Sequence, residues 1–147
     1  REYEAVVSGV MTGGGTVDQP IGRHPKQRKK MAVVKGAKEA RTHYKVLQRF
    51  AGHTYIRVKL ETGRTHQIRV HMASIKYPIV GDDAYGGRFR IHKGVSDQLR
   101  ETLHSFGRQA LHARELGLEH PETGEYMSWT SDLPQDMQQL LQALTDE

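Results

Sequence analysis

Alternation of apolar and polar residues predicts β-strands in the first half of the chain. The clearest strand covers residues 54–61, where Ile56, Val58 and Leu60 occupy one side. Weaker alternation predicts two further strands, at residues 3–9 and 40–50. Glycines and prolines predict loops at residues 11–16, 20–30 and 77–93.

A different spacing, with apolar residues three or four positions apart, predicts a helix over residues 66–76. Ile68, Met72 and Ile75 would form its buried stripe, and Thr65 is the expected N-cap. A glycine turn joins this helix to the strand before it. The pattern therefore predicts a strand, a tight turn and a helix start within a few residues.

In the last third of the chain, the spacing of apolar residues predicts two helices separated by a β-hairpin. Ser96 can cap the first helix and Pro134 can open the second, because each precedes apolar residues at helical spacing. Between them, residues 110–119 and 125–130 are expected to pair as the hairpin. Trp129 alternates with an apolar neighbour in the second strand and is therefore expected in the core.

These elements define the expected fold class: α+β, with a mostly antiparallel mixed sheet flanked by a few helices and long loops. The length of 147 residues fits one domain. Cysteine is absent, which excludes disulfides, thiolate metal sites and cysteine nucleophiles. No apolar run approaches the roughly 20 residues that cross a bilayer, so we expect a cytoplasmic protein without a membrane partner.

The formal net charge of +5 is distributed unevenly along the chain. Residues 23–49 are rich in Lys and Arg, with Glu39 as the single acid, whereas no Lys or Arg follows Arg114. This asymmetry favours a polyanion-binding surface in the first half, and a solvated basic loop is the alternative. The densest cluster of cations contains Lys26, Arg28, Lys29 and Lys30.

The stretch from residue 59 to residue 71 has the strongest chemical character. It places Arg64, His66, Arg69 and His71 around the start of the expected helix, where free backbone amides favour an anion. Arg69 borders the apolar stripe, so its partly buried guanidinium needs an anionic partner, either a ligand or an acid of the same domain in a structural salt bridge. The two histidines of this stretch are five positions apart, which does not match a metalloprotease helix, and no metal site is expected.

Aromatic residues near a basic groove would add a way to bind nucleic acid. A tyrosine ring can stack on an extruded base, which contributes roughly 1–3 kcal/mol per base. Three tyrosines in expected strands are candidates, and the pattern does not choose among Tyr3, Tyr44 and Tyr55.

Several ordered segments resemble one enzyme family. Residues 60–72 (Leu-Glu-Thr-Gly-Arg-Thr-His-Gln-Ile-Arg-Val-His-Met) resemble the third motif of the RluA-type pseudouridine synthases. Tyr77-Pro-Ile-Val-Gly-Asp82 and Tyr85-Gly-Gly87 continue this resemblance. Residues 108–113 and the following His120-Pro121 resemble the next motif, and the family likeness extends to residues 1–5, 14–18 and 23–25.

The resemblance implies isomerisation of uridine to pseudouridine in large-subunit ribosomal RNA, without cofactor or metal. We also expect a monomer. In such enzymes an Asp attacks the target nucleotide, and the base detaches, rotates and reattaches through carbon. By this likeness, Arg69 would pair with the Asp carboxylate, Tyr3 would stack on the flipped uracil and assist proton removal, and Leu111 would pack against the site. The base must leave its stack, which costs a few kcal/mol.

One departure from the family pattern is decisive for activity. The family nucleophile lies in an Arg-Leu-Asp motif ahead of the tyrosine, and this sequence contains no such motif. An S4-type RNA-binding domain is also absent. We therefore expect residues 1–147 to be the C-terminal part of a catalytic domain, from proteolysis or truncation, and to be inactive alone. A noncatalytic RNA-binding module is the alternative.

Overall fold

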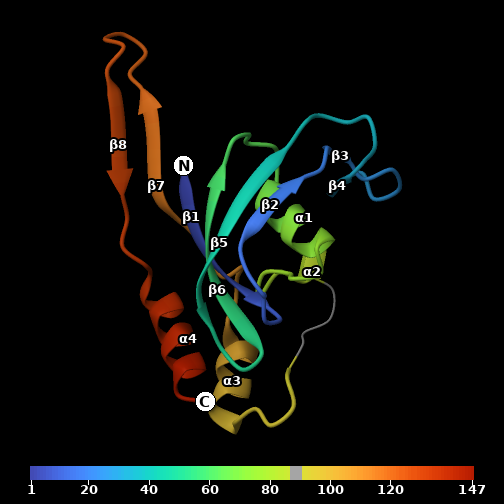
Figure 1. Ribbon diagram of the computed structural model, residues 1–147, viewed down its shortest axis with the longest axis vertical. Coiled ribbons are helices and arrows are strands. Elements are labelled where there is room, and N and C mark those ends of the chain that lie inside the picture. Colours follow the sequence, from blue (N-terminus) through green and yellow to red (C-terminus); the bar gives the residue numbers. More distant parts are fainter. Residues whose placement is uncertain (87–90) are drawn as a thin grey trace.

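A six-stranded sheet organises the computed structural model, which describes residues 1–86 and 91–147 (Figure 1). The strand order is β2-β5-β6-β1-β7-β8, and every pairing between these neighbours is antiparallel. The strands are β1 (Glu2–Ser8), β2 (Gly15–Asp18), β5 (Arg41–Arg49), β6 (His53–Leu60), β7 (Leu111–Glu119) and β8 (Tyr126–Thr130). A small separate sheet contains β3 (Ile21–Arg23) and β4 (Met31–Val33).

Four helices complete the described fold and confirm the α+β class. They are α1 (Gln67–Ser74), α2 (Asp83–Gly86), α3 (Asp97–Ser105) and α4 (Gln135–Thr145). Within residues 1–86 and 91–147, none of the helices combines the length and the apolar character needed to cross a bilayer. Residues 87–90, which belong to an expected loop, lie outside the described part of the chain.

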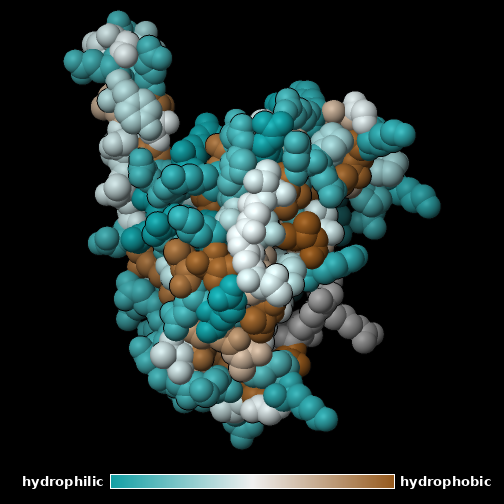
Figure 2. Space-filling model, viewed as in Figure 1, coloured by the Kyte–Doolittle hydropathy of each residue, from teal (hydrophilic) through white to brown (hydrophobic). Residues whose placement is uncertain are grey.

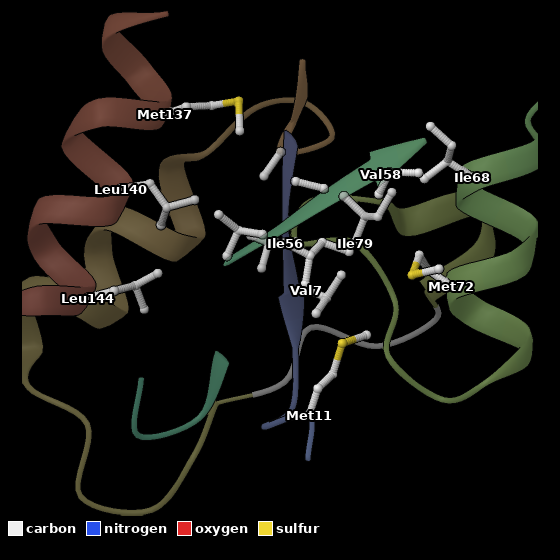
Figure 3. Packing of buried hydrophobic residues seen from close by; sticks show 14 of the residues in the cluster. Val7, Met11, Ile56, Val58, Ile68, Met72, Ile79, Met137, Leu140 and Leu144 are labelled. Atoms are coloured by element: carbon white, nitrogen blue, oxygen red, sulfur yellow. The ribbon is translucent and has the colours of Figure 1, made fainter. Parts of the chain in front are cut away.

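The hydrophobic core lies on both sides of the central strands. Figure 3 shows α1 and α4 on opposite sides of β1 and β6, each directing apolar side chains toward the strands. Ile56 and Val58 of β6 are fully buried, with Met72 of α1 and Leu140 of α4 among the buried residues of the same cluster. This packing fixes α1 against the sheet and so positions the start of that helix.

The predicted helix caps are partly confirmed. The Ser96 hydroxyl accepts a hydrogen bond from the Leu99 amide, and α4 begins directly after Pro134. The expectation that Thr65 caps α1 is wrong. His66 occupies the N-cap position with a left-handed backbone (φ 56°) and makes no side-chain capping bond. The left-handed geometry lets the chain turn sharply from the loop into the helix.

Three short strands lie in or directly after the loops predicted at residues 11–16 and 20–30. Residues 15–18 pair with β5 as β2, and residues 21–23 and 31–33 pair as β3 and β4. These strands have three or four residues each, too few for an alternating pattern to stand out. Their backbone pairing keeps the basic loop at residues 24–30 attached to the domain at both ends.

The expected β-hairpin is present as β7 and β8, but its outer part stands clear of the domain (Figures 1 and 2). The expectation that Trp129 lies in the core is wrong, because its exposed fraction is 50%. The alternation that suggested burial is real, since Trp129 and Met127 share one face of the hairpin. No described residue covers that face.

Candidate active site

A cleft of about 250 Å³ opens where β1, β7 and the start of α1 meet. Ten residues line this cleft. Five of them were predicted from the sequence as site residues, and the other five were not. Its lining is Arg1, Tyr3, Leu60, Gly63, Arg64, His66, Gln67, Ile68, Arg69 and Leu111. The fold therefore brings together side chains that are more than 100 positions apart in the sequence.

Gln67 organises the turn that leads into the cleft. Its side-chain oxygen accepts hydrogen bonds from the Arg64 amide (3.0 Å) and the Thr62 hydroxyl (2.8 Å). Its amide nitrogen donates to the Arg41 carbonyl and to the Thr42 hydroxyl on β5. A buried amide with all these partners holds residues 62–67 rigidly against the sheet. Its role was not anticipated, although it lies inside the family motif.

Arg69 is held by an acid of the same chain. Its Nε and Nη2 donate to the two carboxylate oxygens of Asp82, at 3.1 and 3.0 Å. The Arg69 side chain is 16% exposed and that of Asp82 is 1% exposed, so the pair is largely shielded from water. Paired contacts of this kind fix the plane of the guanidinium as well as its position.

The sequence left open whether Arg69 binds a ligand or an acid of the same domain. The structural salt bridge, which the sequence left open as the alternative, is present. The pairing still leaves one guanidinium nitrogen, Nη1, without a hydrogen-bond partner among the described residues. Because Arg69 also lines the cleft, it can bind a second acceptor while Asp82 holds it in place.

Tyr85 packs beside this pair and links it to His66. The Arg69 guanidinium carbon lies 4.8 Å from the centre of the Tyr85 ring, a favourable cation–π distance. The Tyr85 hydroxyl and His66 Nδ1 are hydrogen-bonded at 2.6 Å. Partial burial, together with the positive charge of Arg69, lowers the pKa of His66, so its ring is neutral at pH 7. Tyr85 and Asp82 were missed as site residues, although both stood in motifs quoted for the resemblance.

Tyr3 and Leu111 enter the cleft from neighbouring strands. Tyr3 on β1 pairs with Ala113 on β7, and Leu111 lies two residues before Ala113 on the same side of the sheet. Both side chains are part of the cleft wall. Arg64 is anchored at its rim by a hydrogen bond from Nε to the Glu39 carbonyl, 2.7 Å long. Tyr44 and Tyr55, the other candidates for stacking, are not part of this wall.

The basic loop lies outside this cleft. Lys26, Arg28 and Lys29 are exposed between β3 and β4, and Lys30 donates to the Ala84 carbonyl at 2.7 Å. Lys30 borders a separate depression of about 350 Å³ between that loop and α1. His71, by contrast, is fully buried and bonded to the Thr42 hydroxyl and the Gln19 carbonyl, so it has no place at the anion site.

The cleft lining determines what chemistry is possible there. It offers arginines, an aromatic ring and an apolar floor, and it contains no Asp or Glu. Within residues 1–86 and 91–147 there is also no cluster of three or more His, Asp or Glu that could hold a metal ion. The cleft suits an anionic, planar ligand, and a carboxylate for nucleophilic attack would have to enter from elsewhere.

Comparison with known proteins gives a consistent result. The family described as RNA pseudouridylate synthase matches residues 1–74. The chain is 61% identical over all its 147 residues to ribosomal large subunit pseudouridine synthase D of Pseudomonas aeruginosa, and covers 46% of that protein. It is 56% identical over 144 residues to the protein of the same name in Escherichia coli, covering 44% of it. The chain thus spans less than half the length of these relatives.

Structural comparison agrees with the sequence match. The fold is similar to human RNA Pseudouridylate Synthase Domain Containing 4, with a TM-score of 0.71 and 28% identity, over 98% of this chain and 61% of the other. The segment matched by the family, residues 1–74, contains all of β1 and α1, the two elements that supply Tyr3 and Arg69 to the cleft. The chain belongs to the RNA pseudouridylate synthase family.

Proposed function

We propose that this chain is the C-terminal part of the catalytic domain of a synthase that isomerises specific uridines of large-subunit ribosomal RNA to pseudouridine. The observation that carries this proposal is the cleft in which Tyr3, Arg69 and Leu111 meet. The relatives named for this activity support it, since they are similar over the whole chain.

In this proposal the cleft receives a flipped uridine. The Tyr3 ring stacks on the uracil and Leu111 packs against it, which offsets the few kcal/mol lost when a base leaves its stack. Arg64 at the rim carries a charge suited to the phosphate next to the target. The neutral ring of His66 can exchange a hydrogen bond with the substrate without adding charge.

Arg69 acts on the incoming nucleophile. Its Nη1 is positioned to bind the carboxylate of an Asp supplied by another part of the synthase, because Asp82 already holds Nε and Nη2. A guanidinium beside a carboxylate keeps that group ionised, as a nucleophile requires. Asp82 itself is buried and bonded to Arg69, so it is a positioning residue and not the nucleophile.

The basic loop supplies the wider RNA contact. Lys26, Arg28, Lys29 and Lys30 lie outside the cleft and can bind phosphates of the surrounding RNA helix. We further propose that the whole synthase acts in the cytoplasm as a monomer, without a cofactor or a metal.

A chimera tests this function. The segment of the Pseudomonas aeruginosa relative that matches this chain is replaced by the 147 residues of the chain. Release of tritium from 5-tritiated uridine in large-subunit RNA measures isomerisation. We expect the chimera to be active, and Arg69→Ala to reduce its turnover at least about 100-fold, because the nucleophile loses its partner.

The Arg69→Ala chimera also separates a catalytic role from a structural one. RNA affinity within about threefold of the parent chimera, with lost turnover, supports the proposed role. Equal loss of RNA binding and of folding would contradict it. Arg57→Ala is a matched control, because Arg57 lies on β6 outside the cleft and pairs with Glu4.

A noncatalytic RNA-binding module is the second candidate. The absence of any acid in the cleft lining favours it, and so does the internal partner of Arg69. An inactive chimera that binds large-subunit RNA as tightly as the Pseudomonas aeruginosa protein would support this module over the enzyme.

A further inference from the structure

The outer face of the β7–β8 hairpin is apolar and open. Leu116 pairs with Trp129, and Leu118 pairs with Met127. Cross-strand partners point to the same side, and residues two apart on a strand do as well, so all four side chains share one face. Their exposed fractions lie between 38% and 50%. The hairpin therefore presents a stripe of four large apolar side chains to its surroundings.

This concentration of apolar surface is confined to the hairpin. Seven large hydrophobic residues are exposed in the described part of the chain, and the hairpin holds all of them except Val10 and Val33. A two-stranded hairpin that stands free is marginally stable in water. A contiguous exposed apolar face is also the usual mark of an interaction site. The stripe thus requires a partner that covers it.

The stripe continues the wall of the cleft. Tyr3 pairs with Ala113, and an irregularity in β7 sets both Arg114 and Glu115 beside Glu2. Leu116 consequently lies on the same side of the sheet as Ala113, next to the position of Arg1. Arg1 and Tyr3 both line the cleft. A partner that covers the stripe is therefore placed beside the opening through which a carboxylate must reach Arg69.

The charge of the hairpin distinguishes between classes of partner. Glu115, Glu119, Glu122 and Glu125 lie on its strands and turn, and no Lys or Arg follows Arg114. An RNA backbone would be repelled by these carboxylates. Self-association through the stripe would bring no carboxylate to Arg69, because Glu115 and Glu119 lie on the opposite face of the hairpin. A polypeptide of a different kind fits the stripe better.

We infer that the stripe of Leu116, Leu118, Met127 and Trp129 is the docking surface for the polypeptide that supplies the nucleophilic carboxylate. This inference rests on the proposed function. The relatives have such additional polypeptide, because this chain covers only 46% and 44% of their lengths. The outer edge of β8 has no strand partner among the described residues, so it can also pair with a strand of that polypeptide.

Trp129 provides a direct probe, since it is the only tryptophan of the chain. The chain and the chimera are each labelled with 5-fluorotryptophan, and the signal lost in Trp129→Phe identifies the residue by fluorine NMR. In the chain alone, we expect the change in chemical shift between H2O and D2O to show an exposed indole. In the chimera, the docking polypeptide covers Trp129, and this solvent-induced change falls to less than about half.

A variant pair tests the stripe through stability. Leu118→Glu places a charge on the stripe, so it should lower the Tm of the chimera by roughly 5 °C or more while leaving that of the chain unchanged. Tyr126→Ser is the matched control, because Tyr126 is 70% exposed on the other face of the hairpin. Because Tyr126 does not belong to the stripe, this variant should not disturb docking, and it should lower the Tm of neither the chain nor the chimera by that route.

Each contrary outcome overturns the inference. Trp129 that stays exposed in the chimera excludes this surface. If Trp129 becomes covered in the chain alone as the concentration rises, and sedimentation shows a dimer, the stripe binds a second copy of the chain. Loss of exposure only after RNA is added assigns it to RNA. Tritium release from the same chimera is measured separately. A chimera in which Trp129 is covered but uridine is not isomerised refutes the proposed function. A chimera that is active while Trp129 stays exposed refutes the docking surface.

Discussion

Arg69 and Asp82 form a two-bond ion pair that connects the first turn of α1 to the loop before α2. The Tyr85 ring lies beside the guanidinium, and Asp82 also accepts a hydrogen bond from the Tyr85 amide. Three residues from two segments thus set the direction of a single arginine at the wall of the cleft. The proposed catalysis depends on this direction, because only one guanidinium nitrogen remains for the nucleophile.

Removing the acid of this pair should cost both stability and activity. Asp82→Ala leaves Arg69 charged, unpaired and largely buried, and breaking a buried pair in this way costs about 3–5 kcal/mol. Urea unfolding of the chain measures the loss. Asp83→Ala is the control, because the neighbouring acid is exposed. Equal stability of the two variants would show that the pair does not support the fold.

Gly81 lies where a side chain cannot fit. Its φ of +82° is left-handed, and an added Cβ would come within 2.0 Å of the Arg108 carbonyl oxygen. Gly81→Ala should therefore destabilise the chain by at least about 1–3 kcal/mol, and should displace the adjacent Asp82. Gly36→Ala is an informative comparison, since Gly36 has the same φ with open space around it. A smaller loss at Gly36 than at Gly81 isolates the cost of the steric clash.

The basic loop should govern the salt dependence of RNA binding. Replacing Lys26 and Lys29 by Gln removes two exposed charges, which should reduce the slope of log K against log salt by about 2. The control replaces Lys93 and Arg100, two exposed cations near α3, far from the loop in Figure 1. Filter binding of large-subunit RNA over a salt series gives both slopes. Equal slopes for the two double variants would show that the RNA does not bind at the basic loop.

His53 should make the fold sensitive to acid. Burial, together with the charge of the nearby His92 ring, lowers the pKa of His53 to about 4 from its usual 6.5. Because the unfolded chain binds this proton more readily, the stability from neutral His53 is complete above pH 6.5 and is lost as the pH falls toward 4. The full effect is about 3 kcal/mol.

The His53 prediction is checked by urea unfolding between pH 7 and pH 4. His53→Gln cannot titrate, so its free energy of unfolding should fall less over this range than that of the parent chain. The exposed Gln98 gives the control, Gln98→Ala, which should keep the parental pH dependence because glutamine does not titrate. A parental pH dependence in His53→Gln would show that burial does not perturb this histidine.

Local sequence patterns were sufficient to predict most of the fold. Strands β5 and β6 and helices α3 and α4 follow their periodicity, since each packs one face against the core. Strand β1 was also predicted, although the residues at its centre are buried on both faces. Short strands such as β3 do not, because three residues carry too little alternation. The N-cap of α1 depended on a left-handed His66 and on Gln67 side-chain bonds across the turn, which are tertiary features.

The candidate site was predictable where a motif named its residues and not where the fold assembled them. Tyr3, Arg69 and Leu111, which the resemblance named, all line the cleft. The partner of Arg69 was not foreseen, because Asp82 reaches it only through the packing of the loop after α1. The prediction that Trp129 lies in the core was wrong, because Trp129 is exposed. Alternation indicates that one face of a strand is covered, but it does not identify the segment that covers it.

The central claim is that this cleft works only with a carboxylate brought from outside the chain. Tritium release from 5-tritiated uridine in large-subunit RNA tests it directly, with the 147-residue chain and the chimera assayed side by side at equal concentration. The chain alone should release no tritium above background, while the chimera should turn over. Tritium release by the chain alone would contradict the claim.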